Sequence, residues 1–377
     1  MFKDYTNDQY TDLRKIHNIL CLVGNGFDVG LINHLNKING SHNKTTSFTD
    51  FYDYLNNKHK SFDNVIYNKM TEDRANNIEN WSDFEFSVQN MLIEQQFPKD
   101  DILQSLYQIS NEFALYLYGL VTPELLIAVN NLSMTNKLAI NSMGKFIKDL
   151  KQRDEINFPK NTYHYHLYNY LFVNFNYTML LDDYIYLDTK QFDPHVYKGV
   201  DRNFDFYPEI VPLNPDNETF WSSYLMSDVI HPHGVQSIPR SIIFGADMPS
   251  YRPYDKEKFL NKPFIAQNDY KYFDLFDKTE LFIIYGMSLG VTDSWWFDNI
   301  FDALTRKDDP AELIIYWHTK SQINDDVIKE KFLSSCVRHE KILHMDAITD
   351  SIKERIFVVQ FSENNTNYLG FNNFSAN

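Results

Sequence analysis

The sequence predicts an α/β protein in which a mostly parallel sheet is flanked by helices and the chain carries a helical insertion. Short apolar runs rich in Ile, Val, Phe and Tyr occur near the start of the chain and again in its second half. Their length and their β-branched and aromatic content are typical of buried strands. Helix-like segments separate the late runs, and such alternation favours parallel pairing through crossover connections.

The expected strands are taken in chain order. The first spans 18–24, where an aliphatic run ends at Gly24. The later strands are expected at 170–175, 228–231, 242–245, 281–286, 313–317 and 356–361. Between the last of these strands, the apolar spacing predicts helices at 294–304 and 324–332.

Residues 49–155 have a different pattern. Apolar side chains recur there at helical spacing, as in Phe48, Phe51, Tyr52 and Leu55 and again in Phe84, Val88, Met91 and Leu92. Such stripes predict amphipathic helices that pack on a core. We therefore expect a sheet domain built from 1–48 and 166–362, a helical insertion at 49–165 and a flexible tail at 363–377.

The composition limits the classes of function. The chain of 377 residues has a net charge of −16, which argues against a broad nucleic-acid surface because such surfaces need clustered Lys and Arg. Its two cysteines, Cys21 and Cys336, cannot build a four-thiolate zinc site. No apolar run approaches the roughly 18 residues of a membrane span, and the first residues lack an apolar signal segment. We expect a cytoplasmic protein without a metal and without a membrane partner.

The most informative motif is the glycine turn at 24–28, which follows the first expected strand. Glycines at this place permit a tight turn and let backbone N–H groups approach a pyrophosphate. A full dinucleotide fingerprint needs a third glycine three residues after Gly26, where this chain has Val29. Two interpretations therefore stay open, a nucleotide turn and a strand-to-helix turn without a ligand.

Polar residues also follow two later strands. Asn174 and Asn176 lie at the end of the second expected strand, where an amide can bind a ribose or a water. Capping of the next turn is the structural alternative. His231 and His233 follow the third expected strand, and a histidine there can act as a general base. Two structural histidines bonded to backbone carbonyls are the alternative.

Ser288 lies in a Gly-x-Ser-x-Gly run that begins at Gly286, at the end of another expected strand. With Asp293 at the start of the next helix, it could hold a phosphate or a ribose. The run also matches the nucleophile elbow of hydrolases, but those enzymes place their acid and histidine after the serine. Asp83 and Glu85 suit the start of a further helix.

Taken together and in this order, these blocks resemble the AbiH family of phage abortive-infection proteins. The matching blocks lie at 23–28, 47–55, 81–85, 174–178, 231–234 and 286–289. More distantly, the same order is similar to SIR2-like proteins, which bind NAD in a Rossmann-like domain with an inserted helical module. The resemblance therefore implies a Rossmann-like (SIR2-like) sheet and NAD as substrate or ligand.

The SIR2-like resemblance also implies roles for single residues. Asn176 and His233 would act at the nicotinamide riboside, and Gly24, Gly26 and Ser288 would match the dinucleotide-holding positions. Beyond the resemblance, we expect Asp28 to hold a ribose hydroxyl or the attacking water. The further residues expected to bind the dinucleotide are Asn25, Phe27, Asn174, His231, Gly286 and Asp293. The chain lacks the four zinc cysteines of true sirtuins, and Thr178 stands where SIR2-like chains often have Asp. Protein deacylation is therefore not expected.

We expect an antiphage abortive-infection effector that hydrolyses NAD to nicotinamide and ADP-ribose. The alternative is a non-catalytic nucleotide-binding sensor in phage defence that acts through a partner. A small-molecule nucleotide is the expected ligand in both, with a phage-derived trigger protein and a homo-oligomer as further expected partners. A nuclease is disfavoured by the net charge of −16 and by the lack of a metal-carboxylate motif in the sequence.

Overall fold

The computed structural model describes residues 1–6, 13–58, 62–78, 81–136, 138–160, 166–186, 190–191, 224–247, 260–339, 346–362, 367 and 369. Within these residues, seven strands form one sheet in the order β3-β4-β2-β1-β5-β6-β7. The strands are β1 (Lys15–Val23), β2 (His166–Asn174), β3 (Lys190–Gln191), β4 (Tyr224–Ile230), β5 (Leu281–Tyr285), β6 (Glu312–His318) and β7 (Ile356–Phe361). Every neighbouring pair is parallel except β3 with β4. The predicted α/β fold with a mostly parallel sheet is confirmed.

The order of the parallel strands is that of a Rossmann fold. Without the antiparallel edge strand β3, the strands follow the classic doubly wound order, with β1 in the middle. The chain continues from β1 to β2 on one side, and it returns to β5 on the other side. Ligands of such sheets bind outside the carboxyl ends of the strands at this switch point. The fold therefore directs attention to the turns after β1 and β5.

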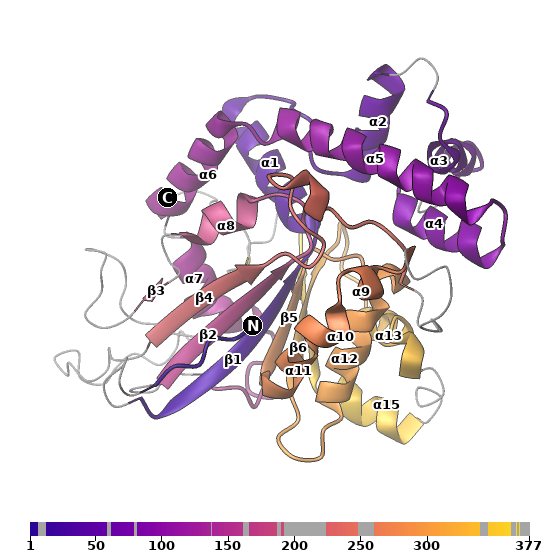
Figure 1. Ribbon diagram of the computed structural model, residues 1–377. Coiled ribbons are helices and arrows are strands. Elements are labelled where there is room, and N and C mark those ends of the chain that lie inside the picture. The colour runs from indigo at the N-terminus through magenta and orange to yellow at the C-terminus, as the bar shows by residue number, and fades with distance from the viewer. Residues whose placement is uncertain are drawn as a thin grey trace.

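Both faces of the sheet are buried. In β1, Cys21 and Val23 belong to one apolar core and Leu20 and Leu22 to the other, as the two-residue period of a strand requires. One face is covered by α1 (Gly26–Asn39), α6 (Pro123–Asn136), α7 (Leu138–Lys145) and α8 (Leu180–Ile185). The other is covered by α11 (Phe273–Lys278), α12 (Ser294–Leu304), α13 (Asp325–Ser334) and α15 (Asp346–Lys353) (Figure 1).

A third apolar cluster lies over the carboxyl edge of the sheet. It is built by α2 (Phe48–Lys58), α3 (Val65–Ala75), α4 (Phe84–Ile93) and α5 (Lys99–Leu120), together with Tyr177 and Phe244 from the sheet domain. In Figure 1 these helices stand above the strand ends. The helices α6 and α7 pack on the sheet instead, so the helical stretch contributes to two cores. The boundaries of the insertion, 49–165, stay a prediction.

One expected strand is wrong. Residues 242–245 form no strand, and the nearest pairing is an isolated bridge between Ala246 and Asn261. The apolar run is explained by packing, because Phe244 lies in the core of the α2–α5 cluster. The predicted helices at 294–304 and 324–332 correspond to α12 and α13.

The structure also bears on the predicted tail and on the predicted lack of a membrane span. Of the predicted flexible tail, the described residues are Asn367 and Leu369, and both are buried. The rest of 363–377 lies outside the described residues. Within the described part of the chain, no single helix has both the length and the apolar character that a membrane crossing needs.

Candidate functional site at the switch point

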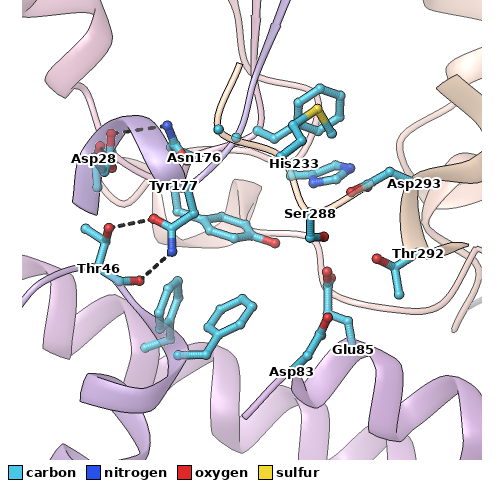
Figure 2. Close-up of a pocket in the computed structure, with 18 of the residues that line it drawn as sticks. Asp28, Thr46, Asp83, Glu85, Asn176, Tyr177, His233, Ser288, Thr292 and Asp293 are labelled. Atoms are coloured by element: carbon cyan, nitrogen blue, oxygen red, sulfur yellow. Dashed lines mark hydrogen bonds between the residues drawn. The ribbon is translucent and has the colours of Figure 1, made fainter. Parts of the chain in front are cut away.

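A cavity of about 240 Å³ lies at the carboxyl edge of the sheet, and we call it the switch-point cavity. Its walls come from the turns after β1, β2, β4 and β5 and from α4 and α5 of the helical cluster (Figure 2). Small-molecule sites commonly have volumes of about 300–1,000 Å³. The cavity is therefore suited to enclosing part of a nucleotide, and not a whole dinucleotide. Among the predicted site residues, those that line it are Gly24, Asn25, Asp28, Asn176, His233, Gly286, Ser288 and Asp293.

The glycines after β1 allow two strand-end turns to interlock. Gly24 N donates to Tyr285 O and Gly26 N donates to Gly286 O, each at 2.9 Å. A Cβ atom at Gly24 would lie 2.7 Å from Gly286 O, and one at Gly26 would lie 2.7 Å from Gly286 Cα. Gly286 itself has a φ of 68°, which favours glycine. Both N–H groups are thus engaged by the neighbouring turn, and this geometry does not leave them for a pyrophosphate.

Asp28, in the first turn of α1, is fully buried and accepts two hydrogen bonds from the turn after β2. Asn176 Nδ2 donates to Asp28 Oδ1 at 3.1 Å, and Thr178 Oγ1 donates to Asp28 Oδ2 at 2.5 Å. Burial raises the pKa of Asp28 to about 7, and the hydrogen bond from Thr178 offsets only part of this effect. An aspartate at position 178 would place a second carboxylate against Asp28, so the threonine suits this arrangement.

This contact orients the amide of Asn176. Its backbone N–H donates to Asn174 Oδ1 at 3.0 Å, and its Nδ2 is used by Asp28. The remaining polar atom, Oδ1, is buried, and no described residue donates to it. Leaving a buried acceptor without a donor costs about 1–3 kcal/mol. Asn176 Oδ1 is therefore a natural acceptor for a ligand hydroxyl or a water.

Two hydrogen bonds join Asn25, at the start of α1, to Thr46 in the loop that leads into α2. Asn25 Nδ2 donates to Thr46 O at 3.0 Å, and Thr46 Oγ1 donates back to Asn25 Oδ1 at 2.5 Å (Figure 2). Thr46 and Asn25 both line the cavity. Because both polar ends of the Asn25 side chain are used, its first role is to hold the cavity wall in place.

His233, after β4, is buried beside two aromatic rings. Its ring lies 5.1 Å from that of Phe175 and 6.4 Å from that of Tyr177, measured between centroids. Desolvation, supported by the positive charge of Lys262, lowers the pKa of His233 to about 3. The imidazole is therefore neutral at physiological pH. It can accept or donate a hydrogen bond, but it is a weak base.

Four predicted site residues lie outside the cavity wall. His231 Nε2 pairs with the Asp182 carboxylate at 3.0 Å. Asn174 is buried and supports the turn that carries Asn176. Phe27 packs edge-on against Tyr184 and Tyr285, and Gly26 lies in the interlocked turns described above.

Three carboxyl groups gather at the opposite end of the cavity from Asp28. They belong to Asp83 and Glu85, at the start of α4, and to Asp293, before α12 (Figure 2). Lys262 of α9 (Lys262–Ile265) is buried behind them, and its Nζ donates to Glu85 Oε2 at 3.0 Å and to Asp293 Oδ1 at 3.2 Å. Burial raises the pKa of Glu85 to about 7 against the effect of Lys262. We call these four side chains the acidic end.

In Figure 2, Ser288 lies beside the acidic end, near Glu85 and Asp293, on the turn after β5. In that turn, besides Gly286, the residue with a left-handed backbone is Leu289, whose φ is 54°. Burial of Leu289 and a hydrogen bond of 2.6 Å from Ser335 Oγ to its carbonyl hold this conformation. A nucleophile elbow strains the serine itself. The geometry of the turn therefore gives the esterase interpretation no support.

Comparison with known families adds an independent observation. Residues 20–317 match the model of the family described as "Bacteriophage abortive infection AbiH". The chain belongs to the AbiH family. The matched region runs from β1 to β6 and contains every residue that lines the cavity, together with Lys262. Membership implies a role in phage abortive infection, as the sequence resemblance predicted. No curated protein matches the chain.

In this AbiH family member, the acidic end is not predicted as part of the site by the sequence, apart from Asp293. Lys262 follows no expected strand, and its partner Glu85 lies 177 residues away along the chain. Asp83 does cap α4, since it accepts from Phe86 N at 3.1 Å, but it also faces the cavity. Among the described residues of the AbiH chain, no cluster of His, Cys, Asp and Glu is arranged to hold a metal ion.

Proposed function

We propose that this AbiH family member acts in abortive infection by hydrolysing NAD at the bond between nicotinamide and ribose. The observation that carries the proposal is the free acceptor of Asn176 at the switch point. The amide is clamped by Asp28, and its Oδ1 has no donor among the described residues. A ribose hydroxyl or the attacking water would supply that donor.

The reaction replaces the bond between ribose C1′ and the nicotinamide nitrogen by a bond between C1′ and a water oxygen. The C1′–N bond breaks, its electron pair passes to the nicotinamide nitrogen, and the positive charge moves to the ribose. A water then adds to C1′ and releases its proton to solvent, which gives ADP-ribose and neutral nicotinamide. Groups that accept hydrogen bonds from the ribose or the water stabilise this transition state more than the substrate.

The cavity provides such groups at one end. Asn176 Oδ1 would accept from the ribose or the water, and Asp28 would keep the amide in place. His233 would accept from a ribose hydroxyl as a neutral imidazole, since its lowered pKa of about 3 makes it a poor proton acceptor. This role replaces that of general base. Phe113 and Tyr177 offer apolar surface for the nicotinamide riboside half of the dinucleotide.

The test is a measurement of NAD turnover by the purified chain, with and without extract from phage-infected cells. We expect nicotinamide and ADP-ribose to form, and Asn176→Ala and His233→Ala to abolish both this turnover and protection of cells. Asn131→Ala and His42→Ala, at exposed positions away from the cavity, are the matched controls. If NAD stays intact in every condition while both cavity variants still protect cells, the proposal is wrong.

A sensor that binds a nucleotide without turnover is the second candidate. It is favoured because neither His233 nor Asp28 is suited to take a proton from the attacking water. His233 is a weak base, and both oxygens of Asp28 already accept hydrogen bonds. Mass spectrometry of small molecules that copurify with the chain separates the two. A sensor would carry an intact nucleotide that Asn176→Ala fails to retain, and it would release no nicotinamide.

A further inference from the structure

The acidic end gives the cavity an uneven charge. Asp83, Glu85 and Asp293 line it, and no lysine or arginine is among the described lining residues. Among the described residues, the positive charge that pairs with these carboxyl groups is Lys262, which is 2% exposed and does not line the cavity. The Lys262 ammonium group donates to Glu85 and Asp293, two of the three carboxyl groups.

The carboxyl groups face one another as like charges. Burial raises the pKa of Glu85 most strongly, and Asp293 and Asp83 raise it further. Burial likewise raises the pKa of Asp83. A positive charge placed in the cavity would relieve this repulsion, because opposite charges within about 4–6 Å favour the ionised carboxylate. The site is thus matched to a cation in the ligand.

We propose that the acidic end selects the substrate by a positive charge on its ring, so that the site takes pyridinium dinucleotides. This inference rests on the proposed function for the dinucleotide itself, and it adds which form of the ring is accepted. The ring of NAD carries one positive charge. The ring of NADH carries none, and nicotinic acid adenine dinucleotide adds a carboxylate that would face three others.

The selection acts on binding more than on bond cleavage. The positive charge leaves the ring as the C1′–N bond breaks, so a carboxylate beside the ring stabilises the bound substrate more than the transition state. Loss of such uniform or ground-state binding raises KM, whereas loss of a transition-state contact lowers kcat. Glu85 and Asn176 therefore have separable effects on the kinetics.

The experiment compares the dissociation constants of NAD, NADH and nicotinic acid adenine dinucleotide by calorimetry. The measurements use the Asp28→Asn background, which keeps the Asn176 side chain and slows turnover, and the shared ADP-ribose part cancels in the comparison. We expect NAD to bind at least about tenfold more tightly than either analogue, and Glu85→Gln to reduce that ratio to about threefold or less. Glutamine keeps an acceptor for Lys262 and removes only the charge.

Two further variants complete the test. Asp293→Asn removes a second carboxylate of the acidic end and should reduce the ratio as well, which covers the case in which Glu85→Gln fails to fold. Glu72→Gln removes an exposed carboxylate from α3 of the same helical cluster and should leave the ratio unchanged. In the background with wild-type Asp28, Glu85→Gln should raise the KM for NAD and leave kcat within about threefold.

The outcomes separate this inference from the proposed function. Equal affinities for the three dinucleotides, or a preference for NAD that survives both charge-removing variants, overturn the charge selection even if NAD is hydrolysed. A preference for NAD that depends on Glu85, found in a protein that never releases nicotinamide, supports the charge selection and contradicts the hydrolysis. Failure of the chain to bind any of the three contradicts both.

Discussion

Asp28 and Asn176 are 148 residues apart in the sequence, and their side chains meet in one hydrogen bond of 3.1 Å. The bond joins the first turn of α1 to the turn after β2. Because Asp28 can only accept when ionised, Asn176 must turn its Nδ2 toward it. Asp28 therefore fixes the orientation of the Asn176 amide, so that Oδ1 is the atom left to contact a ligand.

We predict that Asp28→Asn lowers kcat for NAD by about a hundredfold with little change in KM, since small misplacements of positioning groups have effects of this size. An asparagine offers one acceptor where Thr178 and Asn176 need two, so the Asn176 amide loses its fixed orientation. Steady-state kinetics measure the change, and circular dichroism checks the fold. A kcat within threefold of wild type would contradict the positioning role.

The buried carboxyl of Asp28 also predicts how stability depends on pH. Its pKa is raised from 3.8 to about 7 by burial, so the folded state binds more protons than the unfolded state between these values. Its contribution to the free energy of unfolding is therefore present at pH 4 and is lost as the pH rises to 7. The loss amounts to at most about 4 kcal/mol. Urea unfolding of wild type and Asp28→Asn across this range should show a flatter profile in the variant.

The interlocked turns predict opposite outcomes for two glycines. Gly24→Ala places a Cβ atom 2.7 Å from Gly286 O, so the turns after β1 and β5 must separate. We expect a loss of about 1–3 kcal/mol in the free energy of unfolding, together with loss of ligand binding. Gly30→Ala in α1 meets no atom within 4 Å. It should stabilise the chain by about 0.5–1 kcal/mol. Equal effects in thermal unfolding would show that the turns do not constrain Gly24.

The ion pairs of Lys262 predict that Lys262→Met lowers the free energy of unfolding, and that the loss depends on whether Glu85 is charged. Lys262→Met leaves Glu85 and Asp293 without their shared cation, and removal of one partner of a buried ion pair costs about 3–5 kcal/mol. The double variant with Glu85→Gln should recover part of this loss, because one buried charge is then absent. Chemical unfolding of the single and double variants measures the coupling. Lys307→Met, at an exposed position, is the control, and a similar loss there would refute the prediction.

Local patterns predicted most of the sheet correctly. The strands at β1, β2 and β5 were found because fully buried parallel strands are continuous apolar runs. The same reasoning failed at 242–245, since an apolar run shows that a segment is buried and does not show against what. Phe244 is buried against the helical cluster and pairs with no strand.

The candidate site was predictable only in part. Asp28, Asn176 and His233 each follow or lie near a strand end, and parallel strands bring such ends to one edge. His231 follows the same strand as His233, yet it turns to Asp182. His233 lies beside the rings of Phe175 and Tyr177 instead, and no local sequence pattern predicts these contacts between separate turns.

The sequence by itself determined the α/β class, the AbiH family and the strand ends at which the polar residues gather. Those features depend on composition, on short-range periodicity and on the order of motifs. Only the tertiary structure decided that the glycines of the first turn serve a close contact with Gly286, and that Lys262 stands behind Glu85 and Asp293. Such contacts join residues far apart in the chain, and they form only when the packed elements bring their side chains together.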